Sequence, residues 1–488
     1  MVDVSKIAKG TAVTFFVMFI GLGLNYVFNI FLARWLGPES FGMYSAGLSV
    51  FNLLGLLALL GLDNAVLRYV PSLAFNNIRN VVLNIIGIGS VSCIVVTGVA
   101  YLSYSWLIQK TGANPDLLKV LPYFFMAIPA YVLGAMLLSV LQARHSVQLR
   151  MLAKYVIEPV TKFAVVISLM YFSYTLTAAL VGFVVASWSA ALVAGWGVAK
   201  LMDKKQQSTK QNGSQTKQAI IRYSLPLVGS LMLSGIGNRS DILLLTQFQT
   251  TTDVGLYSAA MQTAAMLVIV GGCIESVFSP YLSACVVKAE IAELKQLYAM
   301  SLRWMFLLGL PLFMMFEIFE TEIMKIFGHQ FAQVGDCLRI LAVAQMINLA
   351  TGSANPILLF SGRTKIVLIN SVVEGVIQLV FNLLLIPKYG VIGAALGAAI
   401  TMGIINVIRV FEVYIIYGLH PYRLGLVKPV VVAGLFAIII HIIQSLMFLD
   451  IDGFLIGLVF ALLVLSILCV GMEKEDRILL KGYVLRMK

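Results

Sequence analysis

The sequence predicts an all-α polytopic membrane protein with about 14 transmembrane helices. First, 60% of its 488 residues are hydrophobic and the mean hydropathy is +0.95, whereas charged residues make up only 11%. Ordinary soluble domains carry roughly 25% charged residues, so no soluble fold could bury this much apolar surface. Second, the apolar residues gather in runs of about 20 or more, the length that a helix needs to cross a bilayer. Third, lysine and arginine are distributed unevenly between these runs.

The candidate spans follow one another along nearly the whole chain. Lys6 and Lys9 precede the first apolar run, as they would in a signal peptide. This run continues to about Ala33 without a clear small-residue cleavage pattern, so we expect a retained helix. The predicted spans lie near residues 9–34, 40–67, 80–107, 117–142, 147–172, 175–200, 220–248, 254–284, 297–319, 335–361, 365–387, 390–418, 424–449 and 452–472.

The distribution of basic residues predicts the orientation in the membrane. Of the 34 lysines and arginines, 25 fall at the termini and in every second loop, six fall in the opposite loops, and three fall within spans. Cytoplasmic loops are enriched in lysine and arginine, so both termini are predicted to be cytoplasmic in a multi-pass protein of the cell membrane. The net charge of +12 is then mostly a topology signal, and nucleic acid is not an expected partner.

A hydrophilic loop and a weak internal repeat divide the chain. The loop over residues 200–218 is basic and rich in glutamine, which is typical of a linker without fixed structure. At an offset of 213 residues, "ESFGMYSAG" from residue 39 matches "TDVGLYSAA" from residue 252, so that Gly42 aligns with Gly255. The linker and the repeat together predict two homologous halves.

Each half would form a six-helix bundle. Because six is even, both halves enter the membrane from the same side, and a pseudo-two-fold axis along the membrane normal would relate them. Two additional C-terminal helices fall outside the repeat. The predicted organisation is an N-terminal bundle (1–200), a cytoplasmic linker (201–218), a C-terminal bundle (219–420), two additional transmembrane helices (421–473) and a cytoplasmic tail (474–488).

The sequence carries no signature of catalysis, of a cofactor or of a metal site. Its five cysteines are scattered without a CxxC pair, and its four histidines are far apart in sequence. This spacing disfavours a disulfide framework and a zinc site. The phosphate-binding motif GxxxxGK[ST] and the hydrolase motifs GxSxG and HExxH do not occur. We therefore expect a protein that is not an enzyme, needs no cofactor and does not hydrolyse ATP.

Four consecutive polar residues interrupt the seventh predicted span: Asn238, Arg239, Ser240 and Asp241. A charge at membrane depth costs a few kcal/mol or more unless it is paired or faces a wet cavity. Residues two apart do not share a helix face, so Arg239 and Asp241 need separate partners. We expect Arg239 to face the cavity and contact substrate, and Asp241 to anchor the bundle or take part in ion coupling. Alternatively, both charges reach the outer interface or pair with loops.

A polar stripe runs along the eleventh predicted span. Glu374, Gln378 and Asn382 are spaced by four and lie on one helix face. Glu374 is about 12 Å along the helix from Ile366, close to the middle of the bilayer. The stripe either lines a polar cavity, where Glu374 titrates or pairs with a cation, or forms a buried hydrogen-bond seam between helices.

The fifth predicted span carries charges spaced by four. Lys154, Glu158 and Lys162 share one face, and Pro159 favours a kink in the helix. Lys154 has the position of an interfacial lysine whose ammonium reaches the water. Lys162 lies deeper and is a candidate for substrate contact, with the same interfacial role as its alternative.

Two asparagines complete the candidate substrate-binding residues. Asn25 is included because the repeat aligns it with Asn238. Asn355 lies in "NLATGSANPILLFSGR", where polar residues, a glycine and Pro356 interrupt the tenth predicted span. Such interrupted segments mark substrate sites or hinges in transporters, and they also occur as simple packing kinks.

Three stretches resemble one transporter family: "LARWLGPESFGMYSAG" (Leu32–Gly47), "NRSDILLLTQFQTTTDVGLYSAA" (Asn238–Ala260) and "NLLLIPKYGVIGAALGAAI" (Asn382–Ile400). In this order, with 14 predicted spans and a basic linker, they look like the polysaccharide-transporter branch of the multidrug/oligosaccharidyl-lipid/polysaccharide (MOP) exporter superfamily. Its members include lipid-linked oligosaccharide flippases. The resemblance runs from the N-terminus to the twelfth span or beyond, and it transfers no site residue.

The resemblance implies two six-helix bundles around a central cationic cavity, with two appended helices. It also implies alternating access without ATP hydrolysis. The implied partners are a polyprenyl-phosphate or pyrophosphate-linked glycan, the lipid bilayer and glycan-assembly enzymes.

Two other functions remain as alternatives. One is a cation-coupled multidrug exporter of the same superfamily, and the other is a membrane-embedded glycan polymerase or ligase. A polymerase would carry a large extracytoplasmic loop, whereas the largest loop here is predicted to be cytoplasmic. A drug exporter would favour an acidic cavity, whereas the deep charges here are mixed: Lys162, Arg239 and Arg409 beside Asp241, Glu275, Glu374 and Glu412.

Overall fold

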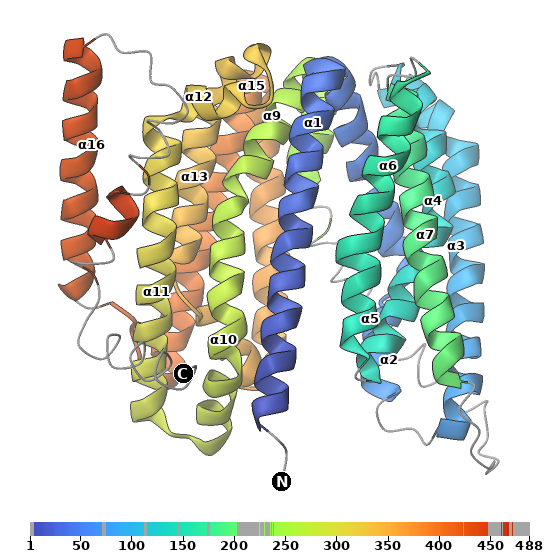
Figure 1. The fold of residues 1–488 in the computed structure, drawn as a ribbon, viewed down its shortest axis with the longest axis horizontal. Helices are drawn as coiled ribbons and strands as arrows, with labels where there is room; N and C mark the ends of the chain where they lie inside the picture. The colour runs from blue at the N-terminus through green and yellow to red at the C-terminus, as the bar shows by residue number, and fades with distance from the viewer. Residues whose placement is uncertain are drawn as a thin grey trace. The chain divides into compact units, whose positions relative to one another are not determined.

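The computed structural model describes most of the chain, and nearly all of that part is helical. It describes residues 4–70, 75–111, 115–144, 146–172, 176–202, 224, 229, 235, 237, 239–422, 424–447, 460, 462–467 and 471. Turns and short loops join the helices, and no strand occurs within these ranges (Figure 1). The prediction of an all-α protein is therefore confirmed.

In the first half of the chain, most helices coincide with predicted spans to within a few residues. They are α1 (Val4–Leu59), α2 (Leu62–Tyr69), α3 (Phe75–Thr111), α4 (Leu117–Ala143), α5 (Val147–Met151), the π-helix η1 (Leu152–Ile157), α6 (Glu158–Met170) and α7 (Leu176–Met202). Residues 239–248 form a further helical segment, in the outer part of the seventh predicted span.

The second half of the chain alternates long helices with short helical turns. Its elements are α9 (Thr251–Ala264), α10 (Met266–Lys288), α11 (Ile291–Ile318), α12 (Glu320–Lys325), the 3₁₀ helix η2 (His329–Val334), α13 (Gly335–Leu349), α14 (Ala354–Phe360), α15 (Thr364–Tyr417), the 3₁₀ helix η3 (Leu424–Leu426) and α16 (Val427–Met447).

The helices pack into two compact units. The first comprises Met1–Ala259, Ile326–Phe331 and Ser371–Ala394, and the second comprises Ala260–Lys325, Ala332–Asn370 and Ala395–Lys488. The first unit thus includes part of α9 and part of α15, which the sequence assigns to the C-terminal bundle. Residues 203–218 of the predicted linker lie outside the described residues, so the domain division at that linker stays a prediction.

A glycine interrupts each of the two longest helices. Gly37 in α1 has φ 73° and ψ 170°, and Gly390 in α15 has φ 54° and ψ −128°. A side chain would disfavour both conformations, whereas glycine adopts them readily. Both glycines lie at or next to a boundary predicted between two spans, so α1 and α15 each contain two predicted spans.

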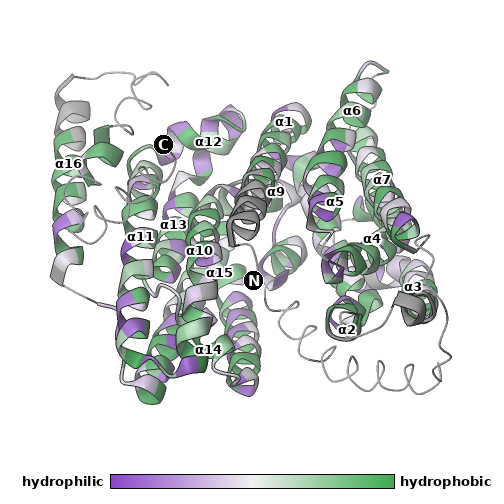
Figure 2. Ribbon diagram, turned by 60° about the horizontal axis from the view of Figure 1, so that its bottom comes forward, coloured by the Kyte–Doolittle hydropathy of each residue, from purple (hydrophilic) through white to green (hydrophobic). Residues whose placement is uncertain are grey.

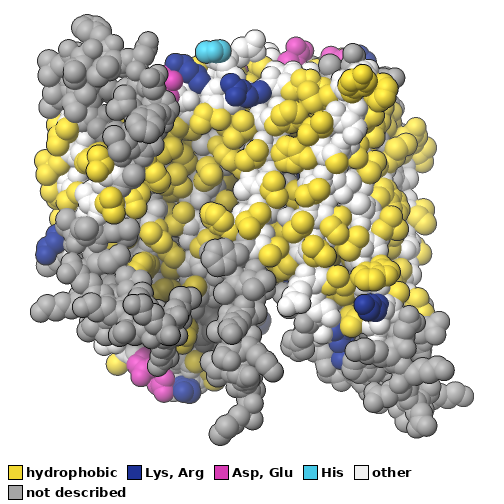
Figure 3. Space-filling model, viewed as in Figure 1, with side chains coloured by type: hydrophobic (Ala, Val, Ile, Leu, Met, Phe, Trp, Pro, Cys, Tyr) yellow, Lys and Arg dark blue, Asp and Glu magenta, His cyan; other side chains and the backbone are white. Residues whose placement is uncertain are grey.

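The helices have the length and composition of membrane spans. Within the described residues, seven are long and apolar enough to cross a bilayer, and the bent pair α13–α14 would be an eighth. Apolar residues run along most of these helices (Figure 2), and charged side chains on the visible surface lie mainly near helix ends (Figure 3). The chain is therefore a multi-pass membrane protein. The count of 14 stays a prediction, because much of 203–238 and 448–488 lies outside the described residues.

The two copies of the sequence repeat meet in space within the first unit. Gly42 of α1 lies against the Thr251 carbonyl of α9, and Gly255 of α9 lies against the Pro38 carbonyl of α1. Pro38 and Thr251 are separated by the same 213 residues as the two glycines, so the contact is reciprocal, as at an isologous interface. A methyl group on either glycine would overlap the facing backbone.

The fifth predicted span contains a wide helical turn where the sequence predicted a kink. The π-helix η1 lies between α5 and α6, and Pro159 sits in the first turn of α6. In a regular α-helix the proline ring would clash with the carbonyl four residues earlier, and one hydrogen bond would be missing. The wider π-turn accommodates the ring. Such turns are rare and occur frequently at functional sites.

Candidate functional site

A polar cavity of about 440 Å³ lies inside the first unit. Ligand pockets typically measure about 300–1,000 Å³, so a small organic group fits this volume. The walls come from α1, α2, α4, η1, α6 and α7 and the end of α5. The side chains on them include Asn25, Asn29, Tyr44, Phe51, Asn52, Asp63, Tyr131, Ser139, Arg150, Lys154, Tyr155, Glu158, Lys162, Phe183 and Ser187.

Basic side chains outnumber carboxylates on the cavity wall. The Lys154 ammonium lies 2.8 Å from a carboxylate oxygen of Glu158, across the end of the π-helix. This pair is neutral overall, which leaves Arg150 and Lys162 opposite the single carboxylate of Asp63. Lys154 therefore lines the cavity as one half of an ion pair while its side chain stays exposed.

Lys162 is the most deeply buried charge of this cavity, with only 7% of its surface exposed. Its Nζ donates to Asn25 Oδ1 at 3.5 Å, and it lies 5.2 Å and 5.6 Å from the ring centroids of Phe28 and Phe183. No carboxylate within the described ranges lies at ion-pair distance from Lys162. The structure thus brings together two of the predicted site residues, Lys162 and Asn25, on one cavity wall.

Aromatic rings and unsatisfied polar groups form the rest of the wall. Phe51 packs edge-on against Phe183 with ring centroids 5.0 Å apart, and Tyr44 packs against Phe183 at 6.4 Å. Tyr44 is 2% exposed, yet its hydroxyl forms no hydrogen bond with any described residue. The Asn52 amide is also without a partner among these residues. The cavity therefore presents donors and acceptors that the protein itself does not use.

A second polar cluster anchors the helical segment 239–248. Asp241 is 6% exposed and accepts hydrogen bonds from the Tyr257 hydroxyl and from the Ile242 backbone N–H, both at 2.7 Å. Tyr257 is fully buried in α9. This geometry places Asp241 inside the helix packing, as expected of a side chain that anchors the bundle.

Part of the polar stripe of α15 belongs to the same cluster. Asn382 is fully buried and donates to Ser240 Oγ at 2.9 Å, and Gln378 donates to Asn382 Oδ1 at 3.3 Å. Of the two interpretations left open by the sequence, the hydrogen-bond seam matches this geometry. Glu374, one turn further from Ser240, is half-buried and remains a candidate for a cavity role.

Arg239 is half-buried next to this cluster. No carboxylate in the described part of the chain lies at ion-pair distance from its guanidinium, and Asp241 is occupied by Tyr257 and Ile242. Arg239 and Asp241 thus have separate surroundings, as their spacing along the helix requires. Asn238, which begins this run of four polar residues, lies outside the described residues.

In the second unit, polar side chains meet at the break in the tenth predicted span. The helices α13 and α14 are bent by 44° there. Thr351 Oγ1 lies 3.2 Å from Asn406 Oδ1, and Ser353 Oγ donates to Ser301 Oγ at 3.0 Å. Asn355, the candidate that the sequence suggested in this segment, is exposed. It is not among the polar residues that meet at the break.

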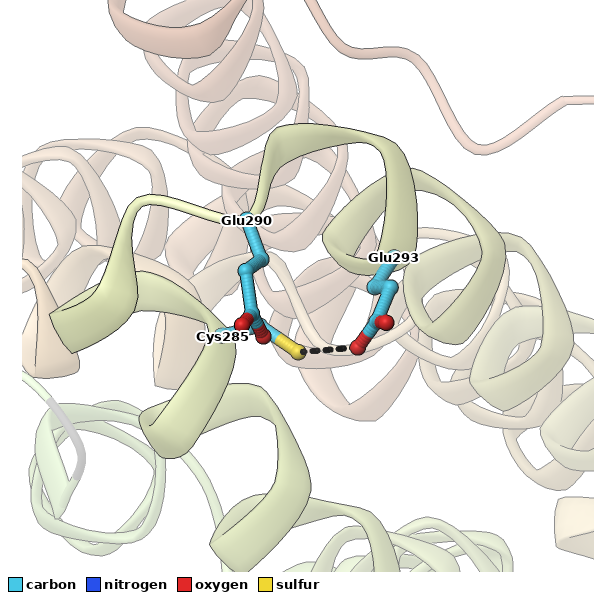
Figure 4. A group of neighbouring side chains, drawn as sticks. All are labelled: Cys285, Glu290 and Glu293. Carbon is cyan, nitrogen blue, oxygen red and sulfur yellow. Dashed lines mark hydrogen bonds between the residues drawn. The ribbon is translucent and has the colours of Figure 1, made fainter.

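One further cluster has the atoms of a metal site. Cys285, Glu290 and Glu293 lie together at the turn between α10 and α11, with Cys285 Sγ 3.8 Å from Glu293 Oε2 (Figure 4). Both carboxylates are exposed, and the Lys288 ammonium lies 3.9 Å from Glu290. Burial and the two nearby carboxylates raise the pKa of the Cys285 thiol. Because a thiol ligand must lose its proton, this turn is a poor metal site, and we assign no ion to it.

Several residues of these clusters were not singled out from the sequence. Tyr44 and Tyr257 occupy equivalent positions of the repeat, and each is buried beside a polar group. The repeat could have marked them as a pair. Asn52, Asp63 and Arg150 carried no signal, because only the tertiary packing brings α1, α2 and α5 around one cavity.

Comparison with known proteins identifies the family. Residues 7–286 match the family described as polysaccharide biosynthesis protein. The chain belongs to this family. Among its relatives, a protein of Haloferax volcanii named as the low-salt glycan biosynthesis flippase Agl15 is 26% identical over 218 residues, which is 44% of this chain and 45% of Agl15. A Shigella flexneri protein named as an O-antigen transporter is 22% identical, over 76% of this chain and 88% of its own length.

Solved structures of MOP transporters share the fold of this polysaccharide biosynthesis protein. The lipid II flippase MurJ, in an inward closed conformation, has a TM-score of 0.74 and 14% identity, covering 96% of this chain and 99% of MurJ. An inward-facing MATE multidrug transporter has a TM-score of 0.68 and 14% identity, covering 81% and 94%. The membership in the polysaccharide-transporter branch that the sequence motifs suggested is confirmed. These relatives are named as flippases and transporters, in agreement with the expectation of a protein that is not an enzyme.

Proposed function

We propose that this protein moves a lipid-linked oligosaccharide or polysaccharide precursor from the cytoplasmic to the outer leaflet of the cell membrane. It does so by alternating access and without hydrolysing ATP. Its partners are a polyprenyl-phosphate or pyrophosphate-linked glycan, the surrounding bilayer and the enzymes that assemble the glycan. The names of the family relatives support this proposal, since they include a glycan biosynthesis flippase and an O-antigen transporter.

The observation that carries the proposal is the composition of the cavity in the first unit. An ionisable residue at membrane depth is costly and is therefore usually functional. Here Arg150, Lys154 and Lys162 face Asp63 and Glu158 across amide and phenol groups. This surplus of positive charge suits an anionic, hydroxyl-rich substrate. It suits a cationic drug poorly, which disfavours the alternative of a cation-coupled multidrug exporter.

Transport in proteoliposomes tests the proposal. We expect the purified protein to expose a fluorescent polyprenyl-pyrophosphate-linked saccharide to an impermeant reagent at the outer leaflet, faster than protein-free liposomes do. Efflux of a lipophilic cationic dye should stay at the protein-free rate. Dye efflux without flipping of the saccharide lipid would favour the drug exporter and remove the proposal.

Arg239 provides a second test of the proposal. We propose that its guanidinium contacts the phosphate or the glycan, because it is half-buried and has no carboxylate partner among the described residues. A charged hydrogen bond contributes about 1.5–3 kcal/mol, so Arg239→Ala should slow flipping by about tenfold or more at matched protein levels.

The matched control is Arg239→Lys. If the lysine variant is active and the alanine variant is not, charge matters more than the two-pronged geometry of the guanidinium. If both variants fail, that geometry is required. Full activity of Arg239→Ala would show that Arg239 does not contact the substrate.

The orientation of the chain gives a third test. The 25 basic residues at the termini and in alternate loops predict a cytoplasmic position for the linker over 201–218. A cysteine at Ser208, in a variant without the five native cysteines, should react with an impermeant maleimide only after the cells are opened. A cysteine in a predicted outer loop, at Lys388, should react in intact cells. Labelling of residue 208 in intact cells would show that the predicted topology is wrong.

A further inference from the structure

Lys162 is a buried cation whose hydrogen-bonding capacity is largely unused. An ammonium has three N–H donors, and among the described residues Lys162 has only the long hydrogen bond to Asn25 Oδ1. Phe28 and Phe183 interact with its charge through their ring faces, but neither ring carries a negative charge. Taking an ammonium out of water is expensive unless an anion and further hydrogen bonds compensate. The protein supplies Lys162 with no such anion within the described residues.

The same wall offers groups that match the remaining surface of a sugar. Within the part of the chain that the structure describes, the Tyr44 hydroxyl and the Asn52 amide have no hydrogen-bond partner, and the Asn29 amide oxygen is free to accept a hydrogen bond. The rings of Phe51 and Phe183 provide flat apolar faces, against which the C–H face of a pyranose can pack. Hydroxyl, amide and aromatic groups around one cation thus surround a volume of about 440 Å³.

We infer that this cavity binds a sugar unit that carries an anionic group, with the anion on the Lys162 ammonium and the sugar hydroxyls on Tyr44 and Asn52. The inference rests on the proposed function, and it narrows the substrate to an acidic glycan lipid where the anion belongs to the sugar. A bound cation is disfavoured, because Lys154 neutralises Glu158 at 2.8 Å and Arg150 and Lys162 outnumber the remaining carboxylate, Asp63. The anion has two sources, a carboxylate of the sugar or a phosphate of the lipid carrier.

Binding of small probes to the purified full chain in nanodiscs tests the inference without any transport step. The probes are D-glucuronate, D-glucose and inorganic phosphate, and the readout is the rise of the thermal midpoint with ligand concentration, which reports binding to the folded state. We expect glucuronate to stabilise the wild-type protein and glucose to have little effect. Stabilisation by phosphate alone would assign the site to the phosphate of the lipid.

Two variants connect this binding to the cavity. Lys162→Met keeps the length of the side chain and removes the charge, so it should weaken binding of the stabilising anion by about tenfold or more. Tyr44→Phe removes one oxygen and should weaken glucuronate binding by a smaller factor. Lys200→Met is the matched control, since Lys200 is exposed over Trp196 in the same unit, and it should bind as the wild type does.

Two outcomes would overturn the inference. One is that neither anion stabilises the wild-type protein. The other is that both cavity variants, Lys162→Met and Tyr44→Phe, bind the anion as tightly as the wild type does. The ligand-free midpoints from the same scans show whether each variant is folded. The binding assay uses soluble probes and needs no transport. A failure of saccharide flipping in liposomes would therefore contradict the proposed function without changing the outcome of the binding assay.

Discussion

Leucine at Gly42 or at Gly255 should abolish most transport and lower the thermal stability of the protein. The backbones of α1 and α9 touch at these two positions, and even a methyl group would overlap the facing carbonyls of Thr251 and Pro38. Overpacking a contact costs about 1–3 kcal/mol and sometimes more. A conformation disfavoured by that amount loses about 5- to 150-fold in population. The expected result is at least about a fivefold loss of flipping by either variant.

The control for this prediction is a leucine at Gly87 of α3. Gly87 is exposed, and a Cβ at that position meets no other atom within 4 Å, so Gly87→Leu should express and transport as the wild type does. Flipping rates in proteoliposomes and thermal midpoints in detergent check all three variants. Wild-type values for Gly42→Leu and Gly255→Leu would show that the close crossing of the two repeats is unnecessary.

Replacement of Asp241 by alanine is expected to have the second large effect. The change removes the carboxylate that accepts from the Tyr257 hydroxyl and from the Ile242 N–H, both at 2.7 Å. Hydrogen bonds to a charged group contribute about 1.5–3 kcal/mol. Asp241→Ala should therefore unfold at a lower temperature and lose transport.

Asp241→Asn separates the structural role from ion coupling. Its amide oxygen can still accept the Tyr257 hydrogen bond, but the side chain has no charge. If Asp241 acts only as an anchor, the asparagine variant should recover both stability and flipping. If the charge takes part in coupling, the variant should be stable and inactive. A wild-type thermal midpoint for Asp241→Ala would contradict the anchoring role.

Much of the fold could be predicted from the sequence, because the bilayer imposes a simple requirement. Backbone N–H and C=O groups have no water to bond with in the hydrocarbon, so long apolar runs must form helices. This requirement locates α3, α4, α7 and α11 to within a few residues of the predicted spans. Gly37 and Gly390 fall at or next to predicted boundaries between two spans, because the chain must leave the helical conformation where one span ends and the next begins.

Pairwise contacts between helices could not be predicted in the same way. The spacing of Gln378 and Asn382 shows that they share a face, but it does not show what that face meets. The structure places Ser240 opposite Asn382 at 2.9 Å, so this part of the stripe is a seam between helices. Asn355 illustrates the opposite case, since it is polar in an apolar run and is nevertheless exposed.

By itself, the sequence determined that this is an all-α multi-pass membrane protein of the polysaccharide-transporter branch. It also indicated two internal repeats, in which Gly42 aligns with Gly255. Helical periodicity and hydropathy are local properties, and they suffice for such conclusions. Only the tertiary structure decided that Lys162 lies beside Asn25 and near the rings of Phe28 and Phe183, and that Asp241 accepts a hydrogen bond from Tyr257. These contacts join residues from different helices, and they depend on how close-packed side chains fit one another, which no local pattern records.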